Sequence, residues 1–160
     1  MKKFALTICA LAIVALSFGQ KASDVKIDKS KLQFNAGVGL STWGIPLYIG
    51  ADYWITPEIT VGLEASLRYR VLHGYGAIGG SINGNYHFAK LLDLPDNMDL
   101  YGGISAGPYI YIGSGFLDAF NVGIGLQAGG RYRINDHLWI NAELGGGTLS
   151  GAKFGITLRR

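Results

Sequence analysis

Two groups of residues in this sequence have types and spacings that could support chemistry: a glycine-rich stretch and three histidines. Residues 122–136 contain Gly123-x-Gly125-x-x-Ala128, a spacing with which dinucleotide-binding proteins bring the backbone close to a pyrophosphate. That fingerprint needs a buried parallel strand, glycines in a turn and then a helix. Here the alternation of apolar and polar residues continues through both glycines to Asn135. We therefore interpret the stretch as a strand.

The histidines do not form a catalytic or metal-binding pattern. A hydrolase needs a base beside a nucleophile and an acid that orients the base. His73, His87 and His137 are scattered, and Cys9 is the only cysteine, so no metal-ligand spacing is present. We expect His73 and His137 in connections and His87 at an inward rim position, with solvated or hydrogen-bonded roles. No catalytic residue, metal site or cofactor is predicted.

The N-terminus has the pattern of a secretory signal peptide, assigned to residues 1–20. Lys2 and Lys3 precede an apolar run over residues 4–18, and this run is shorter than the ~20 residues that span a bilayer. Cys9 lies inside the run, so neither lipidation nor a disulfide is expected in the mature chain. Removal of the leader reduces the 14 basic residues to 12 against 11 acidic ones, so nucleic-acid binding is not implied.

The remaining chain divides into a polar lead-in, residues 21–30, and one domain, residues 31–160. Of the 160 residues, 49% are hydrophobic and only 16% are charged. Period-two alternation continues from residue 31 to the C-terminus and predicts eight strands with short connections, an up-and-down meander. The predicted strands are residues 32–40, 47–55, 59–70, 78–88, 100–112, 122–134, 138–144 and 153–159, and the longest connection is 89–99.

The alternation leaves open which face of the strands is inside. A soluble barrel turns its apolar side chains inward, whereas a membrane barrel turns them to lipid and fills its interior with polar ones. The polar face here is rich in glycine and aromatics, and the middle of the apolar face carries no charge. These features favour an all-β, eight-stranded antiparallel transmembrane β-barrel. A secreted soluble β-barrel that binds a small ligand remains the alternative.

Aromatic residues on the apolar face gather near the strand ends, as in the girdles of membrane barrels. The predicted membrane-interface aromatics are Phe34, Tyr53, Tyr86, Phe88 and Tyr132 at one rim and Tyr69, Phe120 and Phe154 at the other.

Polar and charged residues on the polar face are predicted to form an interior network, because buried charges need partners. Its members are Asp52, Glu64, Arg68, Arg70, Gln127, Arg131, Arg133 and Glu143. If Ile134 pairs with Leu138, then Arg131 and Glu143 become diagonal neighbours. An ion path is one interpretation, but we favour a structural plug, because eight strands leave space only for side chains.

The chain from residue 31 to 160 resembles the small eight-stranded outer-membrane barrels of the OmpX and OmpA type. The closing segment KFGITLRR is similar to their assembly signal in Lys153, Gly155 and Leu158, but ends in Arg160 where the family has an aromatic residue. The resemblance implies a location in the outer membrane. The oligomeric state is left open by the sequence, although nothing in it requires more than a monomer. The expected partners are the lipid bilayer, lipopolysaccharide and the barrel-assembly machinery.

The resemblance also bears on enzymatic activity and orientation. Some small barrels of this type modify lipid A, and the deacylases among them carry a serine two residues after a histidine, which none of the three histidines here has. We therefore predict a non-enzymatic protein with a structural or surface-interaction role and no open pore. A lipid-A-modifying enzyme of the same fold is the alternative. A periplasmic N-terminus places the longest connection on the periplasmic side.

Overall fold

The computed structural model describes residues 31–41, 44–70, 75–113, 120–147 and 151–159. The predicted signal peptide and lead-in lie outside these ranges. The described strands are β1 (Leu32–Leu40), β2 (Ile45–Thr56), β3 (Ile59–Arg70), β4 (Tyr75–His87), β5 (Met98–Gly113), β6 (Asn121–Arg133), β7 (Leu138–Gly147) and β8 (Ala152–Arg159). Among the described residues, no helix is long and apolar enough to cross a membrane.

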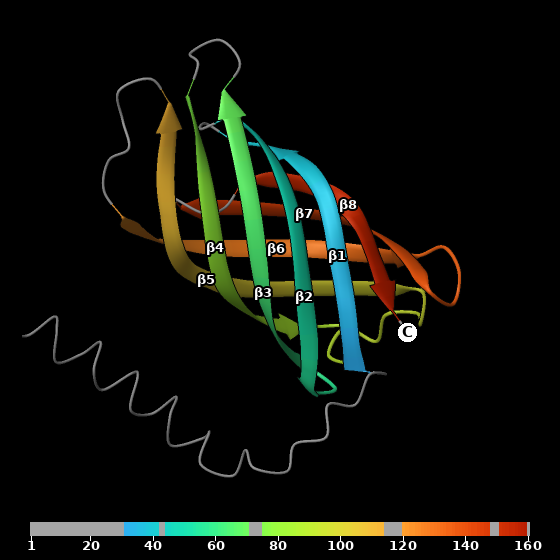
Figure 1. Ribbon diagram of the computed structural model, residues 1–160. Helices are drawn as coiled ribbons and strands as arrows, with labels where there is room; N and C mark the ends of the chain where they lie inside the picture. Colours follow the sequence, from blue (N-terminus) through green and yellow to red (C-terminus); the bar gives the residue numbers. More distant parts are fainter. Residues whose placement is uncertain (1–30, 42–43, 71–74, 114–119, 148–150, 160) are drawn as a thin grey trace, which may run out of the picture.

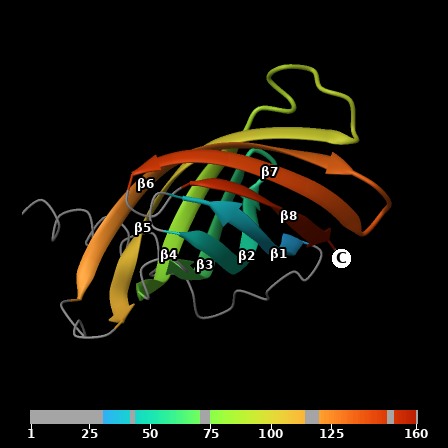
Figure 2. The same ribbon diagram turned by 90° about the horizontal axis from the view of Figure 1, so that it is seen from above.

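The eight strands form one closed antiparallel barrel in which every strand pairs with its neighbours in sequence order. β1 and β8 complete the ring, with pairs from Gln33↔Arg159 to Leu40↔Ala152. Figure 1 shows β1–β4 side by side in the near wall with β6 crossing behind them, and Figure 2 gives the view from above. The predicted eight-stranded up-and-down barrel is therefore confirmed.

We call the rim where β1 begins and β8 ends the N-terminal end of the barrel. Two tight turns lie at this end. Pro57 and Glu58 connect β2 to β3, and the Glu58 amide donates a 3.2 Å hydrogen bond to Thr56 Oγ1. Between β6 and β7, Asn135 Oδ1 accepts hydrogen bonds from the amides of His137 and Leu138. A short polar side chain that bonds to amides two and three residues later stabilises such a turn.

The longest described connection, residues 88–97, also lies at the N-terminal end. It is shorter than predicted, because β5 begins at Met98 and makes ladder pairs from Met98↔Tyr132 onward. This corrects the placement of Asp99, which was expected in the connection and is instead a buried residue of the barrel interior. The other strand bounds differ from the predicted ones by at most three residues.

The two faces of the strands have opposite chemistry. Along β6, Val122, Leu126 and Tyr132 are exposed while Gly123 and Gln127 are buried. Every strand carries large apolar side chains on its outer surface, and the most buried side chains in the described barrel are polar, including those of Gln33, Thr60 and Thr157. This polarity is the reverse of that of a water-soluble domain, in which apolar side chains fill the interior.

Candidate functional site

A lysine from the last strand forms the centre of one ionic cluster in the interior. Lys153 Nζ lies 2.8 Å from Glu64 Oε2 on β3 and 3.0 Å from Glu143 Oε1 on β7. We call these three residues the Lys153 cluster. The lysine side chain is only 8% exposed. A buried ammonium needs charged partners, because its desolvation costs several kcal/mol, and the two carboxylates provide them.

A second ionic cluster consists of Asp52, Asp99 and Arg131, and we call it the Arg131 cluster. Arg131 Nη2 on β6 donates a 3.1 Å hydrogen bond to Asp52 Oδ2 on β2, and Arg131 Nη1 lies 4.0 Å from Asp99 Oδ2. Since β2 and β6 lie four strands apart in a ring of eight, the Arg131–Asp52 pair crosses the interior. Asp52 also accepts hydrogen bonds from Gln33 and Asn35.

Tyrosines connect the two clusters. The Tyr101 hydroxyl donates a 3.0 Å hydrogen bond to Glu143 Oε2, and the Arg131 guanidinium lies 4.6 Å from the centre of the same ring. The centre of the Tyr48 ring lies 5.2 Å from the Lys153 ammonium, and the Tyr48 hydroxyl donates a 2.9 Å hydrogen bond to Asn141 Oδ1. The interior is thus one continuous network of charges, hydroxyls, amides and aromatic rings.

The register around the β6–β7 turn is as predicted, but the ion pairs of Arg131 are with residues of other strands. The Ile134 amide donates to the Leu138 carbonyl at 2.9 Å, and the ladder makes Arg131 and Glu143 diagonal neighbours. The ion pair of Arg131 is nevertheless with Asp52. The alternation within one hairpin carries no information about the side chains of the opposite wall, and these side chains decide the pairing.

Three residues near the N-terminal end have the order of a catalytic triad. Thr60 Oγ1 lies 3.0 Å from His87 Nε2, and His87 Nδ1 lies 2.8 Å from Asp99 Oδ2. A hydroxyl, an imidazole and a carboxylate in this order can activate a nucleophile. Thr60 is 0% exposed, however, and the ring of Trp54 lies 4.1 Å from that of His87. The Thr60 hydroxyl is therefore closed off from solvent, and the three residues form a hydrogen-bonded chain in the barrel interior.

A polar cavity of about 20 Å³ lies among Asn85, Gln127, Arg131 and their neighbours. A water molecule needs ~10–15 Å³ of such space, so this cavity holds about one. Gln127 donates a 2.7 Å hydrogen bond to Asn85 beside it. Over the ranges that the structure covers, no three His, Cys, Asp or Glu side chains are grouped as metal ligands.

Most of the predicted interior residues point into the barrel. Asp52, Arg68, Gln127 and Arg131 are buried, and Glu64 and Glu143 are half-buried. The side chain of Arg70 lies outside the described residues. Arg133 is a correction: it is exposed, because it is the last residue of β6 and lies beside the turn at the rim, where its guanidinium is 5.9 Å from the centre of the Trp139 ring.

The centre of one cluster, Lys153, was absent from the predicted network. Lys153 was considered only as part of the closing segment. The alternation of the last strand could have identified Lys153 as an interior residue, because Lys153 has the same parity as Thr157 and the opposite parity to Phe154. In the structure, Lys153 and Thr157 are buried and Phe154 is exposed. His87, expected at an inward rim position, is buried and hydrogen-bonded.

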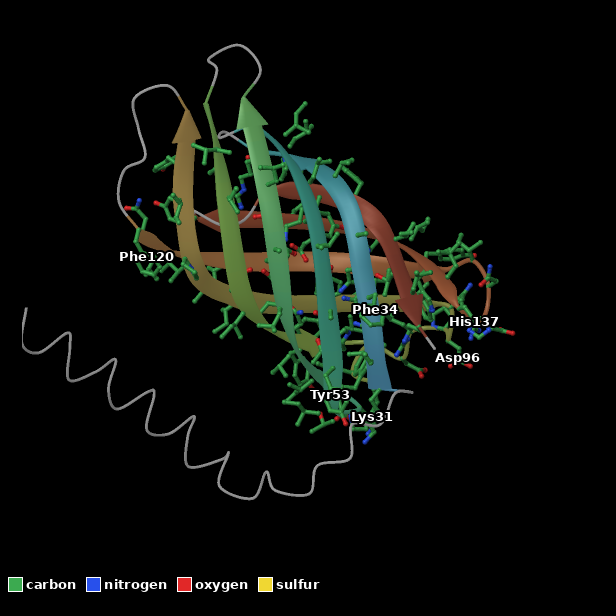
Figure 3. The ribbon with its side chains drawn as sticks, viewed as in Figure 1. Lys31, Phe34, Tyr53, Asp96, Phe120 and His137 are labelled. Carbon is green, nitrogen blue, oxygen red and sulfur yellow. The ribbon has the colours of Figure 1, made fainter. Side chains whose placement is uncertain are left out.

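The predicted interface aromatics occupy the outer surface wherever their side chains are described. Phe34, Tyr86, Phe120, Tyr132 and Phe154 are exposed, Tyr53 and Phe88 are half-buried, and the side chain of Tyr69 lies outside the described residues. Figure 3 shows Tyr53 near Lys31 at the N-terminal end and Phe120 toward the opposite end. Tyr86 and Phe88 make an edge-to-face contact, with ring centres 5.1 Å apart.

Solved structures of other proteins have the same barrel architecture as this chain. No family model and no curated protein matches the chain. Among solved structures, the N-terminal β-barrel domain of Pseudomonas aeruginosa OprF is 18% identical, with a TM-score of 0.57 over 82% of this chain and 98% of that one. The Yersinia pestis outer membrane protein Ail is 12% identical, with a TM-score of 0.53 over 82% and 99%.

A de novo designed transmembrane β-barrel is also similar, at 15% identity and a TM-score of 0.56 over 83% of this chain and 98% of that one. These identities are too low to transfer a function, but the shared architecture extends over nearly the whole length of each structure. The resemblance to barrels of the OmpX and OmpA type is therefore confirmed at the level of the fold. This chain has the fold of the small eight-stranded transmembrane β-barrels.

Proposed function

We propose that this chain is an integral outer-membrane protein of a Gram-negative bacterium, with a structural or surface-interaction role. The observation that carries the proposal is the reversed polarity of the closed barrel. Leucines, isoleucines and valines cover its outer surface, while ionic clusters fill its interior. In water, exposing so much apolar surface would favour aggregation. In lipid, the same surface is well solvated, and the closed ladder satisfies the backbone.

The proposed role is that of a filled barrel rather than an open pore. The Arg131–Asp52 pair crosses the interior, the Lys153 cluster joins β8 to β3 and β7, and the cavity beside them holds about one water molecule. An ion passing through would have to displace these paired charges. We also propose that the protein is not an enzyme, and the complete burial of Thr60 in the triad-like arrangement supports this.

Orientation and partners follow from the same proposal. Export by the predicted signal peptide would place the N-terminal end of the barrel, with connection 88–97, in the periplasm. The closing strand, with Lys153, Gly155 and Leu158, would be recognised by the barrel-assembly machinery. Phospholipid and lipopolysaccharide would surround a monomer.

Membrane fractionation tests the proposal most directly. We expect the protein in the outer-membrane fraction, with a gel mobility that differs between boiled and unboiled samples, because a closed barrel resists detergent until it is heated. Its absence from that fraction would exclude the membrane assignment. In planar bilayers we expect no stable conductance steps, and regular steps would contradict the filled interior. Altered lipid A in an expressing strain would favour an enzyme.

A further inference from the structure

A cavity at the N-terminal end of the barrel brings together two cations that the interior ionic clusters do not use. Its volume is about 280 Å³, and it lies between the start of β1, the end of β2 and the end of β8. Its lining residues are Lys31, Trp54, Ile55, Thr56, Pro57 and Arg159. We call it the rim cavity, and Figure 3 shows Lys31 at this end. We propose that the rim cavity binds the phosphate group of a soluble phosphate monoester.

Arg159 is held in position but has no anionic partner. Its guanidinium carbon lies 5.0 Å from the centre of the Trp54 ring and 5.1 Å from the centre of the Trp139 ring, and such cation–π contacts orient the side chain. Among the described residues, no carboxylate oxygen lies within 4.0 Å of its side-chain nitrogens. The residue is only half-buried. Its planar N–H groups can therefore pair with two oxygens of one phosphate.

The charge of the rim cavity matches that of a phosphate monoester. None of the residues that line the cavity is acidic. Glu58, which follows Pro57, already pairs with Lys90 at 3.2 Å. A phosphate monoester carries a charge of about −1.5 to −2 at pH 7, which the two cations Lys31 and Arg159 can compensate. A single carboxylate would compensate only one of them.

A β-bulge at the end of β2 contributes to the shape of the cavity. The register with β3 shifts between Trp54 and Thr56, and such bulges re-aim side chains beside functional sites. The Trp54 indole nitrogen donates a 3.2 Å hydrogen bond to Gln33 Oε1, which fixes the ring that contacts Arg159. Thr56 Oγ1 accepts the Glu58 amide, so its own hydroxyl proton remains available to a phosphate oxygen.

The position of the cavity favours a soluble molecule over a lipid headgroup. Trp54 and Arg159 have the inward parity of their buried neighbours Asp52 and Thr157. Their side chains therefore face the barrel axis and not the bilayer, and the proposed orientation places this end in the periplasm. The volume is just below the range of typical small-molecule sites, about 300–1,000 Å³, and suits a phosphate with a short carbon chain.

A fluorescence titration of the folded protein tests the inference. The chain from residue 21 to 160 is refolded into phosphatidylcholine vesicles, and tryptophan emission is followed while glycerol 3-phosphate is added at constant ionic strength. Glycerol is the uncharged control. We expect a saturable change with glycerol 3-phosphate only, because Trp54 lines the cavity. Arg159→Gln should weaken binding by about tenfold or more, since it removes a charge-assisted pair of hydrogen bonds.

Arg133→Gln is the matched control variant. Arg133 is exposed at the same end of the barrel and lies 5.9 Å from the centre of the Trp139 ring, but it does not line the cavity. Its substitution should leave the affinity nearly unchanged. Arg159→Lys should restore only part of the affinity, because lysine lacks the planar pair of donors. If Arg159→Gln does not fold, Lys31→Gln replaces it and should weaken binding several-fold.

Three outcomes would overturn the inference. The first is the absence of a saturable change, or equal affinities in the Arg133 and Arg159 variants. The second is a response to phosphatidylglycerol in the vesicles but not to glycerol 3-phosphate, which would identify a lipid headgroup. The third is binding only after residues 21–30 are removed, which would identify the chain's own Asp24 and Asp28 as occupants. Each of them leaves membrane insertion intact, whereas protein that never enters the vesicles would refute the proposed function itself.

Discussion

At the scale of single residues, the interior depends on a few charges that each satisfy several partners. Lys153 compensates two carboxylates, Glu64 and Glu143, that lie on different strands. Arg131 does the same for Asp52 and Asp99. In a low-dielectric interior, removing one such residue leaves more than one uncompensated charge. The cost of a substitution should therefore depend on which partner remains, and not simply on burial.

Lys153→Met should be among the most destabilising single changes in the barrel. It leaves both Glu64 and Glu143 without their cation, and breaking a buried ion pair in this way costs about 3–5 kcal/mol. The measurement is the free energy of unfolding in urea, with the protein refolded into phosphatidylcholine vesicles. Lys90→Met is the control, because the Lys90–Glu58 pair is exposed and worth about 0–1 kcal/mol. Equal losses in the two variants would contradict the network.

Glu143→Leu should weaken the barrel less than Lys153→Met. The Lys153 ammonium keeps Glu64 at 2.8 Å, and the substitution removes one acceptor from the Tyr101 hydroxyl. An unsatisfied buried donor costs about 1–3 kcal/mol. The same urea titration gives the comparison, and unchanged urea resistance would count against a stabilising role for Glu143.

At the scale of the strands, glycines create the space that the interior side chains occupy. Gly62 on β3 shows this clearly. A Cβ atom there would lie 2.7 Å from the Ala51 carbonyl oxygen and in direct conflict with the Asp52 carboxylate. The absence of a side chain at Gly62 therefore allows Asp52 to reach across the interior to Arg131.

Gly62→Ala should destabilise the barrel by about 1–3 kcal/mol, the usual cost of overpacking a core. Gly84→Ala on β4 should be close to neutral, because nothing lies within 4 Å of its added Cβ. Urea unfolding of both variants under identical lipid conditions provides the measurement. Equal losses of stability in the two alanine variants would contradict the idea that the missing side chain at Gly62 makes room for the Asp52 carboxylate.

At the scale of the whole molecule, the barrel presents an apolar band with rims at its two ends. Leu126 lies in the middle of β6 and is 67% exposed, whereas Ile134 lies just beyond the end of that strand and is 54% exposed. The two residues have similar exposure in the isolated barrel. They differ in their expected depth in a bilayer, which makes them a sensitive pair for the membrane assignment.

Leu126→Arg should cost about 2–4 kcal/mol in vesicles, and Ile134→Arg about 0–1 kcal/mol, because the penalty for a lipid-facing charge falls toward the interfaces. The difference in unfolding free energy between the two variants is the observable. In a soluble barrel both substitutions would be surface changes of little consequence. Equal values would therefore argue against a bilayer around this band.

The alternation of apolar and polar residues predicted the strands and their order, and it divided each strand into an apolar and a polar face. The alternation in β6 already separates Leu126 from Gln127, because successive side chains of a strand point to opposite faces. It also determined most of the inward charges. Asp99 was misplaced because the predicted connection was extended past the turn residues Pro95, Asp96 and Asn97, although β5 begins directly after them at Met98. Arg133 was misplaced because it has the inward parity of β6, whereas its position at the end of the strand leaves it exposed.

Which inward residues meet depends on the closed, curved barrel and not on the sequence pattern of any one strand. Closure of β1 on β8 brings Lys153 to Glu64, and the curvature of the ring brings Arg131 to Asp52 on the opposite wall. These partners are far apart in the chain and on strands that do not pair, so neither register nor alternation encodes their contact.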